Sequence, residues 1–177
     1  MRINFFAGPG AGKSTTAARI FSQLKMRGIS VEQVGEYVKF WSYQNRPVKK
    51  WDQIYLFGKQ QQYEYRYLSA GVKNIVTDSP CFLAAAYSAY YKQEKAISAA
   101  LATLSQEYDK DYPTFNIFLD RGNKQYIQEG RYQNEVQARE LDTFIESLLI
   151  KHRISYKKIP YRDEIAILEA VLEKIDR

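Results

Sequence analysis

The run Gly8-Pro9-Gly10-Ala11-Gly12-Lys13-Ser14-Thr15 contains the residue types that bind phosphate groups. A glycine-rich turn presents backbone N–H groups to phosphate oxygens, a lysine reaches the β- and γ-phosphates, and a Ser or Thr hydroxyl binds Mg²⁺ where the next helix begins. Gly12, Lys13 and Ser14 supply the strict part of this pattern, whereas Ala7 stands where the first glycine is usual. We interpret the run as a nucleotide-binding loop, with a chance glycine-rich turn as the alternative. The predicted cofactor-binding residues are Gly8, Gly10, Ala11, Gly12, Lys13, Ser14 and Thr15.

Two carboxylates follow predicted strands and could act at the same site. Asp78 ends an apolar strand over 72–77, where a carboxylate can hold Mg²⁺; its alternative role is to cap the helix that follows Pro80. Glu36 follows a predicted strand over 29–34 and can accept a proton from an attacking hydroxyl; its alternative is a solvated loop glutamate. We therefore predict Ser14 and Asp78 as metal ligands.

Two arginines flank a charged, glycine-containing stretch that we predict to be a lid over about 121–133. Guanidinium groups there can clamp phosphate oxygens as charge builds during phosphoryl transfer. Arg131, beside Gly130 and directly before a helix, is the stronger candidate, and Arg121 is the second; either can instead be surface charge. The predicted catalytic set is Lys13, Glu36, Asp78 and Arg131, and Arg121 joins the cofactor-binding residues.

Flat rings and amides near this site suggest an acceptor pocket. The predicted helix over 52–70 carries Phe57, Gln60 and Arg66, which suit a nucleobase or an amide-bearing ring, although a core helix with a polar outer face is the alternative. The segment 39–51 interleaves cations with large aromatics, Trp41 among them, and is either a nucleic-acid surface or a packed loop with solvated lysine ends. We predict Glu36, Trp41, Phe57, Gln60 and Arg66 as substrate-binding residues.

The elements that must position these residues follow from the hydrophobic pattern. Apolar strands are predicted over 2–7, 29–34, 72–77, 115–119 and 155–159, with helices over 17–28, 51–70, 94–108 and 135–151, after Pro80, and at the end of the chain. Short strands that alternate with helices indicate an α/β fold with a five-stranded parallel sheet covered on both faces. Ligands bind such sheets beyond the carboxyl ends of the strands, where the phosphate-binding loop, Glu36, Asp78 and Arg121 all lie.

Composition bounds the class of protein. The chain has 177 residues, 45% of them hydrophobic and 26% charged, which fits one globular domain over 1–177 and excludes a disordered or collagen-like chain. No apolar stretch approaches the roughly 18 residues that span a bilayer, so we expect a cytoplasmic protein without membrane segments. The single cysteine, Cys81, leaves no partner for an internal disulfide. A formal charge of +6 favours anionic partners.

The sequence resembles the small P-loop kinases that act on nucleosides and nucleotides, most closely the nicotinamide riboside kinase-like branch with its phage-encoded members. The matching runs are Gly8 to Thr15, Gly35-Glu36-Tyr37-Val38, Thr77-Asp78-Ser79-Pro80 and Gly130-Arg131-Tyr132-Gln133, in that order. The resemblance implies ATP and Mg²⁺ as cofactors, a carboxylate pair at Glu36 and Asp78, and an arginine-bearing lid. Some phage P-loop kinases phosphorylate 5-hydroxymethyluracil within DNA, which implies a DNA acceptor and the host cytoplasm.

We therefore expect an ATP- and Mg²⁺-dependent kinase that transfers the γ-phosphate to a hydroxyl of a nucleoside, nucleotide or modified nucleobase. The first alternative is a kinase acting on 5-hydroxymethyluracil in phage DNA. The second is an ATP-dependent switch or binding module that catalyses no transfer. The sequence leaves these possibilities open.

Overall fold

Five parallel strands form one sheet in the order β2-β3-β1-β4-β5. The computed structural model describes residues 1–92 and 94–175, and the predicted domain of 1–177 extends beyond that described part. The central strand β1 pairs with β3 on one side and β4 on the other, so that Ile3 lies opposite both Val76 and Phe115. The predicted α/β class with a five-stranded parallel sheet is confirmed. The strands are β1 (Arg2–Phe6), β2 (Val31–Val34), β3 (Asn74–Thr77), β4 (Thr114–Asp120) and β5 (Lys157–Pro160).

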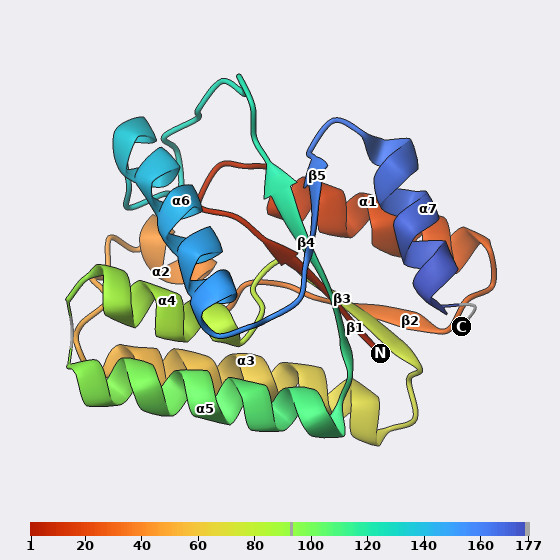
Figure 1. Cartoon of the computed structure of the whole chain (residues 1–177), viewed down its shortest axis with the longest axis horizontal. Helices are drawn as coiled ribbons and strands as arrows, with labels where there is room; N and C mark the ends of the chain where they lie inside the picture. Colours follow the sequence, from red (N-terminus) through yellow and green to blue (C-terminus); the bar gives the residue numbers. More distant parts are fainter. Residues whose placement is uncertain (93, 176–177) are drawn as a thin grey trace.

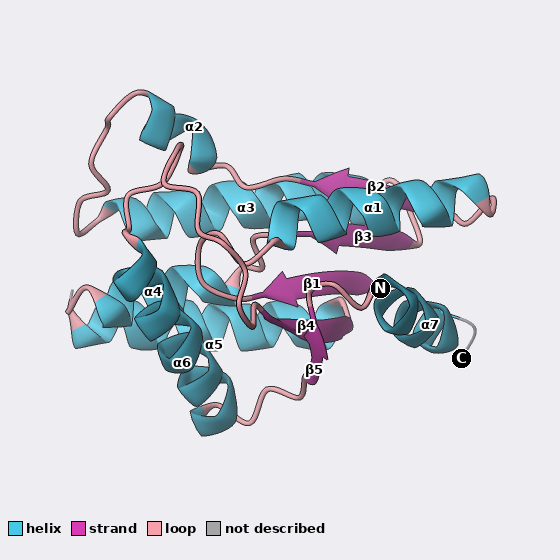
Figure 2. Ribbon diagram, turned by 90° about the horizontal axis from the view of Figure 1, so that it is seen from above, coloured by secondary structure: helices cyan, strands magenta, loops and turns pink. Residues whose placement is uncertain are grey.

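Helices cover both faces of the sheet (Figure 1). One face packs against α1 (Lys13–Met26) and α7 (Glu164–Ile175). The other packs against α3 (Asp52–Ser69), α4 (Phe82–Tyr90), α5 (Lys95–Asp111) and α6 (Glu135–Lys151). The short helix α2 (Lys39–Tyr43) lies apart from both layers, near the carboxyl end of β2 (Figure 2).

Alternating strand residues divide the interior into two apolar cores. Ile3 and Phe5 point into the core beneath α1 and α7, whereas Phe6 points into the core beneath α3 to α6. Ile117 and Phe118 divide in the same way on β4. Successive side chains on a strand point to opposite faces, so a sheet covered on both sides requires apolar residues at consecutive positions. This arrangement explains why the sequence shows short apolar runs without polar alternation.

The predicted elements match the observed ones with small shifts at their ends and one difference in type. We predicted no helix between the second strand and residue 50, but Lys39–Tyr43 form α2. Five residues give too few periodic positions to signal a helix from sequence. The predicted helix over 135–151 has the observed bounds, and its start is fixed by a reciprocal capping box between Asn134 and Gln137.

The segment 121–133, which we predicted to be a lid and refer to by that name, connects β4 to α6 without helix or strand. It crosses from the central part of the sheet to the start of α6, close to α2 (Figure 2). Within the described part of the chain, no helix combines the length and apolar character needed to cross a membrane. The lid and α2 lie at the same end of the sheet as the phosphate-binding loop.

Candidate active site

A cavity of about 770 Å³ opens beyond the carboxyl ends of β1, β2 and β3. The phosphate-binding loop forms one wall, α3 and α4 form the opposite wall, and the lid and α2 form the mouth. Of the predicted site residues, the lining includes Gly10, Gly12, Lys13, Ser14, Thr15, Glu36, Phe57, Gln60 and Arg131. The parallel topology thus gathers residues from four distant parts of the chain into one site.

The phosphate-binding loop wraps around its own lysine. The Nζ atom of Lys13 donates to the carbonyl oxygens of Ala7 at 2.8 Å and Gly8 at 2.9 Å. Gly12, with φ at +104°, immediately precedes α1, and Gly10 has φ at +77°. Both angles lie in the left-handed region that favours glycine. The loop therefore has the backbone shape and the helix start that a bound phosphate requires.

Lys13, Glu36, Asp78 and Arg131 share one electrostatic environment. Burial raises the pKa of the Glu36 carboxyl; Lys13, Lys39 and Arg131 oppose this rise, whereas Asp78 adds to it. Burial likewise lowers the pKa of Lys13, against the attraction of Glu36 and Asp78. Lys13, Glu36 and Arg131 thus line one cavity, and Asp78 is buried near enough to Lys13 and Glu36 to influence both. A carboxylate with a raised pKa is better matched to proton abstraction near neutral pH than an exposed one.

Asp78 does not cap α4, which corrects the alternative reading of this residue. The helix begins at Phe82 after Cys81, and no side chain caps it. Asp78 is instead only 4% exposed, and its Oδ1 atom has no hydrogen-bond partner within the protein. A buried carboxylate oxygen without a partner is costly unless a cation or donor meets it.

An oxygen-only donor set of Asp78 and the cavity-lining Ser14 suits Mg²⁺, which proteins usually hold through one or two carboxylates together with substrate phosphates and water. Among the described residues, no group of three or more His, Cys, Asp and Glu side chains could hold a metal ion by itself. The site therefore fits a magnesium ion shared with a nucleotide and does not fit a cage built from protein ligands alone.

The wall formed by α3 and α4 carries no charged side chain among its lining residues. It presents Gln53, Leu56, Phe57 and Gln60 from α3, and Leu83, Ala84 and Tyr87 from α4. The Nε2 atom of Gln60 donates to Oγ1 of Thr77 at 3.1 Å, while its buried Oε1 atom has no partner within the protein. We predicted Phe57 and Gln60 as substrate-binding residues, and the structure places both in this wall.

Six predicted site residues lie outside the cavity lining: Gly8 and Ala11 of the loop, the buried Asp78, and Trp41, Arg66 and Arg121. Trp41 is buried, stacks on Tyr55 with ring centroids 6.1 Å apart, and carries the Arg46 guanidinium 3.4 Å above its own ring. Arg66 lies exposed near the end of α3. Arg121 is 5% exposed, and its N–H groups donate to Asp142, Pro9 and Ala138. Trp41 and Arg121 therefore have partners within the protein, as packing residues do.

Two hydrogen bonds join the lid to α2 and to the residues that follow it, at the mouth of the cavity. Oγ of Ser42 donates to the Gly130 carbonyl at 2.9 Å, and the Tyr132 hydroxyl donates to the Arg46 carbonyl at 2.5 Å. Gly130 has φ at +68°, and a Cβ atom there would lie 2.8 Å from the Tyr43 ring. Arg131 itself donates to the carbonyls of Ile127 and Glu129, the latter at 3.0 Å.

Sequence reasoning missed several residues that line the cavity or cover the loop. Two of these, Lys124 and Tyr126, come from the lid. The Nζ atom of Lys124 lies 3.2 Å from the position that a Cβ atom on Gly12 would take, and the Tyr126 ring lies 2.7 Å from the position of a Cβ atom on Gly10. Both belong to the stretch already predicted as a lid, where a cation and an aromatic were the available signals. The missed lining residues also include Gln53, Tyr87, Tyr91 and Gln133.

The two remaining chemically notable side chains act structurally. Burial raises the pKa of the Cys81 thiol well above its usual value, as expected of a small buried side chain and not of a reactive thiolate. His152 ends α6 and packs edge-on against Phe82 with ring centroids 5.3 Å apart. Neither side chain supplies the chemistry of the cavity.

A glycine-rich loop that joins the central strand of an all-parallel sheet to a helix, with its lysine at the helix start, defines a P-loop nucleotide-binding protein. The chain belongs to an AAA domain family, whose sequence model matches residues 2–165. No curated protein matches the sequence.

Among solved structures, the crystal structure of the NadR protein in complex with NR superimposes with a TM-score of 0.74 at 14% identity. The superposition covers 99% of this chain and 52% of the NadR chain, so the chain spans about half the length of that protein. This likeness shows that almost all of the chain shares the fold of that structure.

Proposed function

We propose that the chain is an ATP- and Mg²⁺-dependent kinase that transfers the γ-phosphoryl group to a hydroxyl of a nucleoside-like acceptor. The observation that carries the proposal is the position of Glu36, which lines the cavity together with Lys13 of the loop and the uncharged wall of α3 and α4. A base between a phosphate site and a ring-sized chamber is the arrangement that in-line transfer to a bound hydroxyl requires. The NR bound to the similar NadR structure supports the same substrate class.

Each residue has a chemical role in this proposal. Lys13 and the loop amides bind the donor phosphates, and Arg131 and Lys124 of the lid neutralise charge that develops on the transferred group. Ser14 and Asp78 would hold a Mg²⁺ ion, whose charge would stabilise the negative charge of the donor phosphates. The Glu36 carboxylate takes the proton from the acceptor hydroxyl as that oxygen attacks the γ-phosphorus, and the bond to the β-phosphate oxygen breaks.

The charges lining the cavity favour an acceptor without a phosphate group. The basic side chains that line the cavity are Lys13 of the phosphate-binding loop, Lys39 at the start of α2, and Lys124 and Arg131 of the lid. The described cavity residues on α3 and α4 carry no charge. An acceptor monophosphate buried against this wall would lack a cation there, and burying an unpaired charge is strongly unfavourable. A neutral ring with a donor for Oε1 of Gln60 fits the same wall.

A base held within DNA is a second candidate acceptor, favoured by the outer surface of the mouth. Phe40 and Trp51 are 66% and 64% exposed, and Lys39 and Lys49 lie beside them on the surface. Exposed aromatics among cations bind nucleic-acid strands by stacking and by phosphate contacts. A nucleobase could occupy the neutral wall while its backbone stays at this basic surface. This second proposal includes the 5-hydroxymethyluracil acceptor expected from the sequence resemblance.

The deciding experiment follows label from γ-labelled ATP into a panel of acceptors. The panel contains free nucleosides including nicotinamide riboside, nucleoside monophosphates, and duplex DNA with and without hydroxymethyluracil. Label on nucleosides alone supports the first proposal, and label on modified DNA alone, lost as salt rises, supports the second. Label on monophosphates would contradict the neutral-acceptor argument. ATP consumption that no acceptor stimulates would indicate the ATP-dependent switch.

A further inference from the structure

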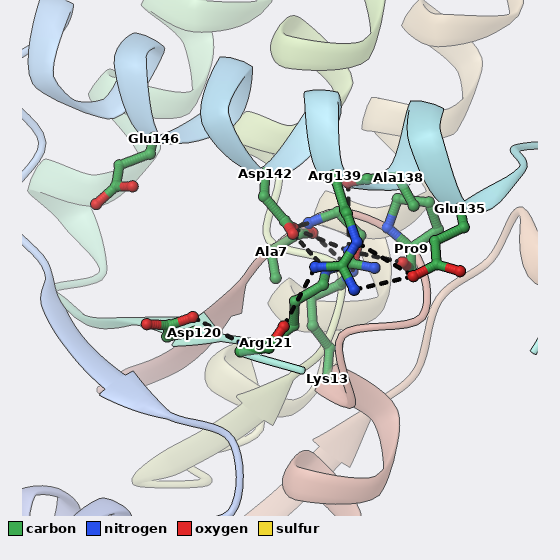
Figure 3. A network of polar contacts seen from close by, with 12 residues as sticks. Ala7, Pro9, Lys13, Asp120, Arg121, Glu135, Ala138, Arg139, Asp142 and Glu146 are labelled. Carbon is green, nitrogen blue, oxygen red and sulfur yellow. Dashed lines mark hydrogen bonds and ion pairs between the residues drawn. The ribbon is translucent and has the colours of Figure 1, made fainter. Parts of the chain in front are cut away.

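A partly buried ion pair lies next to the phosphate-binding loop (Figure 3). The Arg121 guanidinium, at the end of β4, donates from Nε and Nη2 to the two carboxylate oxygens of Asp142 on α6. Asp142 Oδ1 also accepts the backbone N–H of Gly8 at 2.6 Å, and Arg121 Nη2 donates to the Pro9 carbonyl at 2.8 Å. One carboxylate and one guanidinium thus hold two successive residues of the loop.

Gly8 shows how closely α6 approaches the loop. A Cβ atom at this position would lie 2.5 Å from the Ala138 carbonyl, 2.9 Å from Asp142 Oδ1 and 3.2 Å from Arg121 Nη2. Any side chain would therefore push the loop away from α6. The same loop segment carries the Ala7 and Gly8 carbonyls that accept from Lys13 Nζ, so its position also determines where the lysine lies.

The ion pair also joins the two stems of the lid. Arg121 is the first residue after β4, and Asp142 lies two turns into α6, the helix that follows the lid. A second contact between the stems runs from Arg139 Nη1 to the Gly122 carbonyl at 3.2 Å. The residues at both stems therefore contact the loop at Gly8 and Pro9.

We infer that Arg121 and Asp142 are positioning residues that keep the phosphate-binding loop in its nucleotide-binding shape and fix both lid stems to it. The inference rests on the nucleotide binding in the proposed function. Because Arg121 is only 5% exposed and its N–H groups have protein partners, it acts on the nucleotide through the loop. It also neutralises a carboxylate that would otherwise stand beside bound phosphates.

The test measures nucleotide affinity by calorimetry in the full chain, alongside thermal unfolding. Asp142→Ala should weaken ATP and ADP binding by about tenfold or more and deprotect the Gly8 amide in hydrogen exchange. Asp142→Asn keeps an acceptor oxygen for Gly8 and should recover part of the affinity. Glu146→Ala is the matched control, because Glu146 pairs with Lys158 one turn further along α6, away from the loop, and should bind like wild type (Figure 3).

A charge test keeps the inference falsifiable if Asp142→Ala does not fold. Arg121→Gln leaves the Asp142 carboxylate uncompensated near the phosphates and should weaken binding at least as much. The double variant Arg121→Gln with Asp142→Asn removes that charge and should bind ATP more tightly than Arg121→Gln alone. Folded single variants that bind ATP like wild type would overturn the inference. A wild-type chain that binds no nucleotide would instead refute the proposed function on which the inference rests.

Discussion

Arg2, at the start of β1, donates from Nη1 to Oε2 of Glu64 on α3 over 3.0 Å, and neither side chain is more than 1% exposed. The other carboxylate oxygen of Glu64 accepts from Cys81 Sγ at 3.7 Å and from Gln60 Nε2 at 3.4 Å. Gln60 and Cys81 both line the cavity. A buried ion pair at the amino end of the sheet is therefore linked through α3 to the wall of the proposed acceptor chamber.

Removing Glu64 should destabilise the protein strongly. Glu64→Ala leaves the Arg2 guanidinium buried beside the partly exposed Asp109 alone, and breaking a buried pair in this way costs about 3–5 kcal/mol of unfolding free energy. Chemical denaturation measures the loss. Glu107→Ala, which removes an exposed pair with Lys110 on α5, is the control and should change stability little. Equal effects of the two substitutions would contradict the structural role of Glu64.

Lys13→Ala should abolish phosphoryl transfer and leave the fold intact. The ammonium group holds the loop carbonyls in the free protein and the donor phosphates in the proposed complex, so its loss removes transition-state charge stabilisation. Transfer from γ-labelled ATP measures activity, and thermal unfolding verifies the fold. Retained transfer in a folded Lys13→Ala variant would contradict the assignment of the loop.

Glu36→Gln should lower kcat by about 10²–10⁴-fold, the usual contribution of a general base, while ATP affinity stays near wild type. The amide keeps the size and hydrogen-bonding capacity of the side chain but cannot take the proton. Steady-state kinetics give kcat, and calorimetry gives the ATP dissociation constant. A parallel loss of ATP affinity and activity would show that Glu36 supports the loop and does not act as the base.

The pH profile of transfer should report the Glu36 carboxyl. The base must be ionised, so kcat/KM for the acceptor falls as pH drops through its pKa. Burial raises that pKa, with Asp78 adding to the rise and Lys13, Lys39 and Arg131 opposing it. The acid limb should therefore lie above the value of about 4.3 for an exposed glutamate. Glu36→Gln should lack this limb, and a limb at or below the exposed value would refute the expectation.

Removing the two hydrogen bonds that join the lid to Ser42 and Arg46 should weaken binding of the acceptor. Tyr132→Phe removes the hydrogen bond to the Arg46 carbonyl and Ser42→Ala removes the one to the Gly130 carbonyl, each worth about 0.5–1.5 kcal/mol. We expect KM for the acceptor to rise several-fold in the double variant, with a small change in kcat. Tyr65→Phe, on the exposed outer face of α3, is the control. An unchanged KM would show that closure of the lid does not depend on these bonds.

The sequence determined the fold and the phosphate side of the site because these depend on local patterns. Apolar runs of strand length, glycines next to Lys13, and the Asn134–Gln137 capping box act within a few residues of one another. The parallel order then fixes which strand ends meet, so Glu36 and Asp78 could be assigned to one site before any contact was known. The assignment of Gln60 to the acceptor pocket followed from its amide group and from its position on a predicted helix.

Only the tertiary structure decided how the remaining side chains are used. We predicted Arg121, which flanks the lid, as a cofactor-binding residue, but in the folded chain its guanidinium pairs with Asp142, 21 residues later, next to the loop. We predicted Trp41 as a substrate-binding residue, but in the folded chain its ring packs against Tyr55 and Arg46. A side chain takes its partner from whatever the folded chain brings within reach, and that choice depends on packing between distant elements, which local sequence patterns do not contain.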